Sequence, residues 1–338
     1  MNVSDFSKQQ LAGQRLMVGF EGTALNDDLR LLIKELKVGG VILFKRNIET
    51  PDQIRDLSQS IQSCAARFGQ PPLFIAVDQE GGEVARLKPP FTQFPGNPSM
   101  KEEADASRFA EITATELSDV GINMNMAPVL DIAPKDADSV MARRAFGDDP
   151  RWVSRLGAIV IGKLQQKNIM AVAKHFPGIG RTTLDSHLDL PTLNTALELL
   201  QETDFLPFKK AIDEDVAGMM ISHVRFSTLD VRWPASLSEQ TARRLLREQM
   251  GFAGVVMTDD LDMGAIENHF PIDTVIAQIL NADIDIALIC RRSPKIEKAF
   301  KEILKHIENN NEMKQRALAS AKRILALKTR YLKGAGGL

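Results

Sequence analysis

The chain has 338 residues, of which 44% are hydrophobic and 25% are charged, and its formal net charge is -2. This composition is typical of a soluble globular protein, and the length suits one large domain or two ordinary ones. The small net charge and the scattered basic residues provide no electrostatic footprint for nucleic acid or an anionic membrane. We therefore expect neither as a partner.

Residues 1–14 lack the apolar core of a signal peptide, and no run approaches the about 18 apolar residues of a spanning helix. Cys64 and Cys290 lie far apart, so a disulfide is possible, but a reduced cytoplasmic protein is the simpler interpretation. The five histidines show neither HxxxH nor HExxH spacing, and we expect no metal and no cofactor.

Short apolar runs recur along the chain and predict strands. Each run is too short for a helix and is apolar without alternation, which favours strands that are buried on both faces. The predicted strands cover residues 16–20, 39–44, 73–78, 122–128, 171–176, 218–223, 254–259 and 285–290.

Segments with helical periodicity separate these runs. In residues 50–68, Thr50 is expected to cap a helix that begins at Pro51. A second helix is expected to begin after Asp149 and to run to about residue 166. Residues 314–333 are spaced like an amphipathic helix, whose basic residues we expect on a solvated face.

Eight buried strands that alternate with helices predict an α/β fold, a closed (β/α)₈ TIM barrel that forms one domain over residues 1–338. Residues 333–338 are expected to be a short flexible tail. The alternative is an open doubly wound sheet, which usually carries a glycine-rich phosphate loop after its first strand. Here FEGT follows LMVGF, which does not match that fingerprint.

Polar residues stand at the ends of five consecutive predicted strands. They are Asp78, Asn125, Lys174 with His175, His223 and Asp259. The carboxyl ends of barrel strands meet at one mouth, where the active sites of this architecture lie. Each residue alone could be a structural cap, but together they predict a polar pocket at this mouth.

Within this set, Asp78 opens the stretch DQEGG, which is either an ordinary acidic turn or a site that accepts hydrogen bonds from sugar hydroxyls. Arg86 and Arg144 could be surface residues, although Arg144 is expected in the loop after the fourth strand, facing the same mouth. Lys174 ends a buried strand and must find a polar partner there.

The stretch TDDLDM contains Asp259, which continues the seventh strand and is the better candidate nucleophile. Asp260 and Asp262 are explained as acidic residues at a helix N-terminus. In the stretch Asp185-Ser186-His187, the first and last side chains share one side of an extended loop, so Asp185 can orient His187. Alone, this pattern is weak.

Together these motifs resemble glycoside hydrolase family 3, specifically its single-domain bacterial β-N-acetylhexosaminidases of cell-wall recycling. The resemblance runs in order from residue 16 to about residue 290. The matching pieces are GGVILFKRN, VDQEGGEVARL, NMNMAPVLDI, RRAFGDDP, KHFPGxG, DSHLDLP and VVMTDDLDM.

The resemblance implies a retaining exo-β-N-acetylglucosaminidase that removes terminal β-linked N-acetylglucosamine, with muropeptides of peptidoglycan recycling as the expected source. It implies that Asp259 forms a covalent glycosyl-enzyme and that His187, held by Asp185, is the general acid/base. The positions that bind the terminal sugar are Asp78, Arg86, Arg144, Lys174 and His175, to which strand-end placement adds Asn125 and His223. The partner is a small carbohydrate, and we expect a monomer.

The chain departs from the family pattern at three positions. Ile179 stands where a second histidine is common, Arg181 where an acidic residue is common, and Glu83 where a basic or polar residue is common. None is the implied acid/base, so we expect hydrolysis to survive and the leaving-group preference to differ. The leaving group itself stays open between a muropeptide, a chitooligosaccharide and a glycoconjugate.

Four alternative functions are compatible with these residues. The first is a β-glucosidase or xylosidase on the same barrel, and the second is phosphorolysis, since an imidazole acid/base brings no negative charge that would repel phosphate. The third is a Schiff-base aldolase that uses Lys174 as its amine. The fourth is a non-catalytic sugar-binding barrel, suggested by Ile179 and Arg181.

Overall fold

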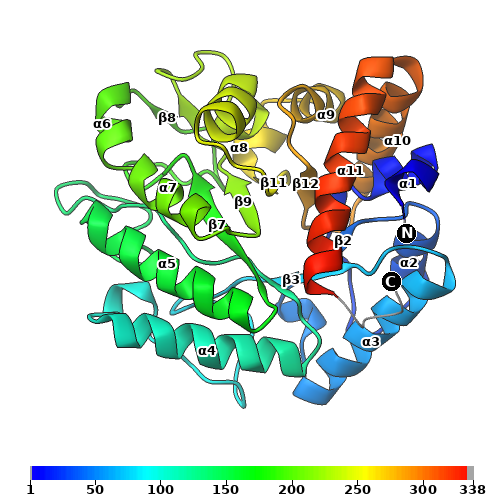
Figure 1. Ribbon diagram of the computed structural model, residues 1–338, viewed down its shortest axis with the longest axis horizontal. Coiled ribbons are helices and arrows are strands. Elements are labelled where there is room, and N and C mark those ends of the chain that lie inside the picture. Colours follow the sequence, from blue (N-terminus) through cyan, green and yellow to red (C-terminus); the bar gives the residue numbers. More distant parts are fainter. Residues whose placement is uncertain (1, 333–338) are drawn as a thin grey trace.

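The structure is a computed structural model that describes residues 2–332. Eight parallel strands close into a barrel, which confirms the predicted (β/α)₈ fold (Figure 1). Each strand overlaps one predicted apolar run, and the pairing of the last strand with the first excludes the open sheet. The barrel strands are β1 (Leu16–Val18), β2 (Gly40–Leu43), β3 (Phe74–Val77), β6 (Met124–Asn125), β7 (Met170–Phe176), β9 (Gly218–Ile221), β11 (Val255–Asp260) and β12 (Ile286–Ile289).

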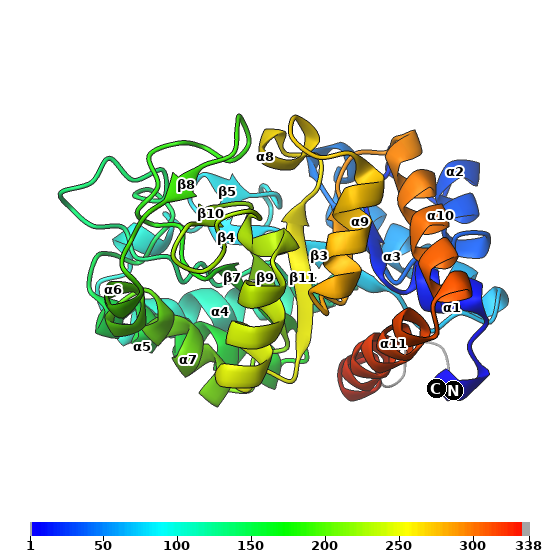
Figure 2. The same cartoon turned by 90° about the horizontal axis from the view of Figure 1, so that it is seen from above.

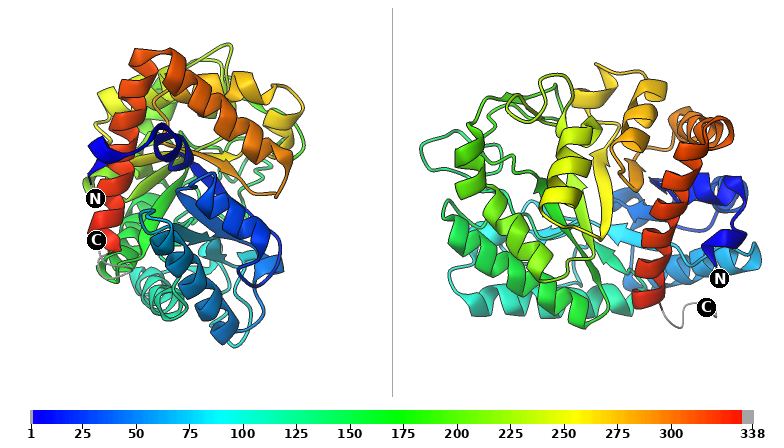
Figure 3. Two further views of the ribbon diagram at one scale, coloured as in Figure 1. Left: turned by 90° about the vertical axis from the view of Figure 1, so that its right-hand side faces the viewer. Right: turned by 45° about the horizontal axis from the view of Figure 1, so that its top comes forward.

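Helices surround the strands on the outside of the barrel (Figure 3). They are α1 (Lys8–Gly13), α2 (Asp27–Lys34), α3 (Pro51–Arg67), α4 (Glu103–Asp119), α5 (Pro150–Gln166), α6 (Leu197–Glu202), α7 (Phe205–Asp213), α8 (Gly264–Glu267), α9 (Ile272–Asn281), α10 (Pro294–Asn309) and α11 (Asn311–Tyr331). A wider helical segment, η5, covers Gln240–Gln249. Short 3-10 turns cover Val3–Asp5, Lys45–Asn47, Asn97–Ser99 and Ala235–Leu237.

The two predicted helix starts are confirmed. Thr50 precedes α3, and its hydroxyl accepts a hydrogen bond from the Gln53 N–H. Asp149 precedes α5, and its carboxylate accepts one from the Arg151 N–H. Both helices have proline at their first position, where the missing N–H leaves no hydrogen bond unmade.

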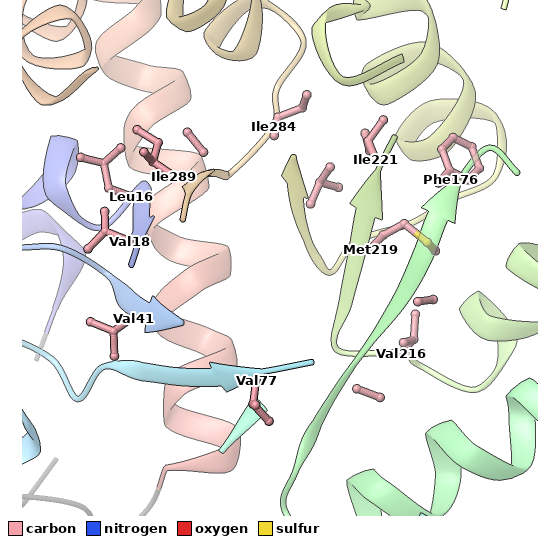
Figure 4. Packing of buried hydrophobic residues seen from close by; sticks show 14 of the residues in the cluster. Leu16, Val18, Val41, Val77, Phe176, Val216, Met219, Ile221, Ile284 and Ile289 are labelled. Atoms are coloured by element: carbon pink, nitrogen blue, oxygen red, sulfur yellow. The ribbon is translucent and has the colours of Figure 1, made fainter. Parts of the chain in front are cut away.

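The strands are buried on both faces, which is why their sequences do not alternate. On β3, Phe74 and Ala76 belong to the cluster that fills the barrel, whereas Ile75 and Val77 belong to the cluster between the strands and the helices. Figure 4 shows members of this outer cluster, among them Val77 and Ile221.

The two ends of the barrel are built differently. The short strand pairs and α8 gather at one end, and α11 lies toward the other (Figure 2). The first pair is an antiparallel hairpin of β4 (Gln79–Gly81) and β5 (Val84–Ala85), and the second joins β8 (Thr192–Leu193) to β10 (Arg225–Phe226). These loops follow the carboxyl ends of the barrel strands, where the candidate site residues lie.

Helix α11 closes the amino-terminal end of the barrel, where Ile324 and Leu327 join the interior cluster. The prediction that its basic residues are solvated is wrong for Lys328, which is fully buried. Its Nζ donates to Gln14 Oε1 at 2.7 Å and to the Gly39 carbonyl oxygen at 2.8 Å. The helix packs across the strands, so more of its circumference is buried than amphipathic spacing indicates.

Within residues 2–332, no helix is long and apolar enough to cross a membrane. Cys64 and Cys290 are both free and buried. The predicted flexible tail, at about residues 333–338, lies outside the described residues.

Candidate active site

A buried ion network lies at the carboxyl ends of β3 and β7. Lys174 Nζ is 2.8 Å from Asp78 Oδ1 and 2.6 Å from Glu80 Oε1. Arg144 donates two hydrogen bonds to the same Glu80 carboxylate, from Nη2 to Oε1 at 2.7 Å and from Nε to Oε2 at 3.0 Å. The structure thus brings three predicted residues together and adds Glu80. The signal for Glu80 was its place in DQEGG, directly after the predicted strand.

Each charged group in this network stabilises the ionised form of its oppositely charged neighbours. Burial raises the pKa of Asp78, but Lys174 and Arg86 outweigh burial and hold that pKa at about 2. Burial lowers the pKa of Lys174, but the carboxylates of Asp78 and Glu80 outweigh burial and raise it. Lys174 is therefore held protonated. This argues against the Schiff-base alternative, because the neutral amine is the nucleophilic form of lysine.

Arg86 reaches the network from the β4–β5 hairpin. Gln79 Oε1 accepts hydrogen bonds from the backbone N–H groups of Arg86 and Leu87, which fixes the return strand. Arg86 Nη2 is 3.5 Å from Asp78 Oδ2, and the guanidinium lies 5.4 Å from the centroid of the Phe44 ring. Its Nε is buried and has no hydrogen-bond partner among the described residues.

His175 is oriented by Asp131, a residue that the sequence analysis missed. His175 Nδ1 lies 2.7 Å from Asp131 Oδ2, and Asp131 Oδ1 accepts from the Ile179 N–H at 2.7 Å. Asp131 is fully buried. An acidic residue inside the apolar stretch VLDIA was the available signal. A bond from Nδ1 to a carboxylate fixes the tautomer and leaves Nε2 for another partner.

Asp259 lies at the end of β11, as predicted, and its side chain is only partly exposed. Its Oδ1 accepts a hydrogen bond from the Asp260 N–H at 2.8 Å. Burial raises the pKa of Asp259, but the nearby imidazoles of His175 and His223 outweigh burial and lower it. The group is therefore a carboxylate at neutral pH, the form that attacks an electrophilic carbon.

The predicted dyad forms on a long segment after β7, residues 178–190, here named the arm. His187 Nδ1 lies 2.8 Å from Asp185 Oδ1, and the same oxygen accepts the His187 backbone N–H at 2.8 Å. Burial raises the pKa of Asp185, but these hydrogen bonds to His187 outweigh burial and lower it. The His187 side chain is 66% exposed, so its other ring nitrogen is open to a ligand.

The arm is attached to α8, the helix that directly follows the β11 segment carrying Asp259. The Gly264 N–H donates to the His187 carbonyl oxygen and the Ala265 N–H to the Ser186 carbonyl oxygen, both at 3.1 Å. A Cβ at Gly264 would lie 2.4 Å from the Leu188 carbonyl oxygen, so only glycine permits this approach. The dyad and Asp259 are thereby joined through one short stretch of chain.

Asn125 and His223, which were predicted to contact substrate, are both fully buried, and their polar atoms are hydrogen-bonded within the protein. The Asn125 amide bonds both the N–H and the carbonyl oxygen of Gln79 at 3.0 Å, which holds the start of the hairpin. His223 bonds Ser236 Oγ through Nδ1 at 2.6 Å and the Asp260 carbonyl oxygen through Nε2 at 2.9 Å. Both side chains therefore hold backbone segments at the mouth of the barrel in place.

Asp260 and Asp262, which were expected as acidic residues at a helix N-terminus, tie β11 to β12 and α10, and no side chain among the described residues caps α8. Asp260 Oδ1 accepts the Cys290 N–H at 3.0 Å, and Asp262 Oδ1 lies 2.6 Å from Lys295 Nζ. Burial, with Asp262 nearby, raises the pKa of Asp260 to about 6. Of the two adjacent aspartates, Asp259 therefore has the lower pKa.

The two departures at the base of the arm have clear structural roles. Ile179 is 5% exposed and belongs to the outer hydrophobic cluster. Arg181 Nε lies 3.0 Å from Asp204 Oδ2, and its Nη2 lies 3.1 Å from Thr203 Oγ1. Burial raises the pKa of Asp204, which has almost no exposed surface. Arg181 therefore anchors the arm to the α6–α7 junction.

The mouth of this (β/α)₈ barrel presents carboxylates and an imidazole, groups that can act as a nucleophile and as a general acid/base. Among residues 2–332, no group of three or more histidine, cysteine, aspartate or glutamate side chains is placed to hold a metal ion. The profile of the family described as glycosyl hydrolase family 3 N terminal domain matches residues 9–327. The chain belongs to this family.

Curated relatives carry the name β-hexosaminidase. One from Alkalilimnicola ehrlichii is 34% identical over 301 residues, which cover 86% of this chain and 84% of the relative. β-Hexosaminidase A from Pseudoalteromonas piscicida is 34% identical over an alignment of 373 residues that covers 97% of this chain. This chain spans only 62% of that second relative.

Solved structures give the same grouping. A glycoside hydrolase family 3 β-N-acetylglucosaminidase from a Paenibacillus species is 37% identical with a TM-score of 0.94, over 98% of this chain and 64% of that one. A β-N-acetylhexosaminidase from Beutenbergia cavernae is 26% identical with a TM-score of 0.87, over 96% of this chain and 99% of that one. The barrel is thus nearly the whole of some relatives and about two thirds of others.

Proposed function

We propose that this chain is a retaining exo-β-N-acetylglucosaminidase that removes terminal β-linked N-acetylglucosamine, with muropeptides of peptidoglycan recycling as its source. The observation that carries the proposal is the connection between Asp259 and the Asp185–His187 dyad through α8. It connects a carboxylate on β11 with an imidazole on the arm that follows β7. Membership of family 3 and the names of the relatives support the choice of sugar.

In this proposal the reaction proceeds in two steps. The Asp259 carboxylate attacks the anomeric carbon while His187 donates a proton to the departing oxygen, which leaves a glycosyl ester on Asp259. His187 then takes a proton from a water molecule, the water oxygen attacks the same carbon, and the ester bond breaks. Asp185 bonds Nδ1 of His187, so Nε2 is the nitrogen that exchanges the proton. Two inversions preserve the anomeric configuration.

The ion network serves as the binding surface for the terminal sugar. Asp78 accepts hydrogen bonds from sugar hydroxyls, Arg86 and Lys174 donate to them, and His175 accepts through Nε2, because its Nδ1 bonds Asp131. The oppositely charged neighbours hold these side chains in place before the sugar arrives, so little reorganisation is needed on binding. Glu80 keeps Lys174 and Arg144 together from below.

Hydrolysis of 4-nitrophenyl N-acetyl-β-glucosaminide, compared with the matching glucoside, tests the choice of sugar. We expect a strong preference for the N-acetylated substrate, and a preference for the glucoside would replace our proposal with the β-glucosidase alternative. A 2-fluoro or 5-fluoro sugar that traps the intermediate should label Asp259, as shown by peptide mass spectrometry. Unchanged activity of Asp259→Ala would remove the assigned nucleophile.

Phosphorolysis is the second candidate, and it is favoured by the exposure of His187, whose uncharged base form does not repel an anion. The natural substrate and the acceptor are tested together with an N-acetylglucosaminyl-anhydromuramyl compound, with and without inorganic phosphate. Free N-acetylglucosamine at the same rate in both reactions supports hydrolysis. Formation of the sugar 1-phosphate with faster turnover supports the phosphorylase.

A cytoplasmic location belongs to the same proposal. The two cysteines, Cys64 and Cys290, are free and buried, in keeping with a reducing compartment. Fractionation of cells that produce the full chain at its natural level tests this point, and recovery with periplasmic or surface proteins would contradict it.

A further inference from the structure

The exposed arm has a second attachment to the segment after β11, made by side chains. Beyond the backbone bonds to α8, Asn268 Nδ2 donates to the Leu188 carbonyl oxygen at 3.3 Å. His269 Nε2 forms a short hydrogen bond with Asp189 Oδ1. Asp189 follows His187 by two residues, so this bond acts directly beside the dyad.

Neighbouring groups restrain the Asp189–His269 pair. The bond from His269 lowers the pKa of Asp189, so the carboxylate stays ionised and the hydrogen bond is charge-assisted when His269 is protonated. Asp189 Oδ1 also accepts the Leu190 N–H at 2.8 Å, which fixes the rotamer of the carboxylate. On the other side, the His269 ring lies 6.1 Å from the Phe270 ring.

The segment that receives the arm is itself fixed to the barrel. Lys295 Nζ on α10 lies 2.6 Å from Asp262 Oδ1 and 2.9 Å from Glu267 Oε1 at the end of α8. Asp262 Oδ2 also accepts the Arg291 N–H at 2.8 Å. The segment from Asp259 to His269 is therefore held to the next β/α unit.

We propose that Asp189 and His269 form a latch that sets the position of the acid/base His187 relative to Asp259. The two latch residues are positioning residues, because they bond the arm and not the reacting atoms. The proposal rests on the proposed function, in which His187 protonates the leaving oxygen. Without the latch, only the backbone bonds to α8 and the Asn268 contact join the arm to the segment after β11, and the imidazole is less well placed for proton transfer.

The test compares leaving groups, because a dinitrophenolate departs without protonation and a weakly acidic phenol does not. The variants are His269→Phe, Asp189→Ala and their combination, each in the full chain. The control is Glu103→Gln, which removes a remote surface ion pair between α4 and α5. We expect kcat/KM for the 4-methoxyphenyl N-acetyl-β-glucosaminide to fall ~10-fold or more, and kcat/KM for the dinitrophenyl substrate to stay within ~3-fold.

Two further readouts separate positioning from structural damage. On the dinitrophenyl substrate, kcat and KM of the latch variants should fall together, because the second step still needs a base. Added azide should restore kcat, because azide attacks without one. The double variant should match the worse single variant, since both changes break one bond.

Equal losses on both substrates, or behaviour like the Glu103→Gln control, would overturn the latch while leaving the proposed function intact. A wild-type chain that hydrolyses neither N-acetylglucosaminide overturns the proposed function, and the latch with it. Thermal unfolding of each variant shows whether the fold persists, and His269→Gln, which keeps a donor near the Nε2 position, should recover part of the lost activity.

Discussion

Lys174 Nζ lies 2.6 Å from Glu80 Oε1, and both side chains are only 2% exposed. The same carboxylate takes the two-point contact from Arg144, so Glu80 balances two cations at once. Removing one partner of a buried ion pair leaves the other charge unpaired in a medium of low polarity. Glu80 therefore controls the charge balance beneath the predicted sugar site.

Replacing Glu80 with glutamine should lower both stability and activity. The free energy of unfolding should fall by about 3–5 kcal/mol, because Lys174 and Arg144 lose their common anion. KM should rise, since Arg144 loses its carboxylate partner and Lys174 is then held by Asp78 alone. Urea unfolding and steady-state kinetics measure the two effects. Glu83→Gln is the control on the exposed turn of the same hairpin, and equal unfolding curves for the two variants would contradict the prediction.

The sequence was sufficient to predict the fold and much of the site for a physical reason. Parallel strands buried on both faces need continuous apolar runs, and their carboxyl ends meet at one mouth, so a polar residue that ends a run has a known location. This reasoning placed Asp78, Lys174, His175 and Asp259 at the mouth, where the structure has them.

The position of a residue at a strand end does not show the direction of its side chain, and that direction decides its contacts. Asn125 and His223 come from strand ends, but their side chains bond the backbone of Gln79 in β4 and of Asp260 in β11, and no sequence pattern shows these contacts. Asp131 lies in the loop after β6 and contacts His175, and Glu80 lies in β4 and contacts Lys174 and Arg144. Their roles depend on contacts between segments far apart in the chain, which local patterns do not show.

Arg181→Ala should destabilise the protein more at neutral pH than at acidic pH. Burial already raises the pKa of Asp204, so the folded state binds that proton more tightly than the unfolded state. Stability from this group is present at low pH and is lost as pH rises through the folded-state pKa. Removing Arg181 raises that pKa further, so the loss at pH 7 should exceed the loss at pH 4, by about 1–3 kcal/mol.

Urea unfolding at the two pH values measures this difference. The control is Arg225→Ala, because Arg225 bonds the neutral hydroxyl of Thr192 at 2.9 Å and its removal should have the same effect at both pH values. A loss for Arg181→Ala that does not change with pH would show that Arg181 acts through packing alone.

The buried Lys328 should make the free energy of unfolding rise with pH, in contrast to the buried Asp204. Burial lowers the pKa of its amine to about 7, and the two acceptors of its Nζ match the two protons of a neutral amine. Between this value and the ordinary lysine pKa, the unfolded state binds more protons, so stability rises with pH. Relative to Lys328→Met, the wild type should gain up to about 1.4 kcal/mol per pH unit in that window.

Unfolding free energies at pH 7, 8 and 9 test this slope. Lys322→Met is the matched control, since Lys322 is an exposed lysine of the same helix, and its difference from the wild type should not change with pH. Parallel curves for the wild type and Lys328→Met would mean that Lys328 keeps its charge in the folded state.

Gly264→Ala should reduce activity without unfolding the protein. The new Cβ would lie 2.4 Å from the Leu188 carbonyl oxygen and 2.8 Å from that of His187, and backbone atoms cannot rotate away, so the arm must shift. We expect kcat/KM for a weakly acidic leaving group to fall ~10-fold or more. Gly162→Ala on α5 is the control and should stay fully active, because an added Cβ there would have no atom within 4 Å beyond the backbone of its own helix. Equal activity of the two variants would show that the approach of Gly264 to the arm does not position His187.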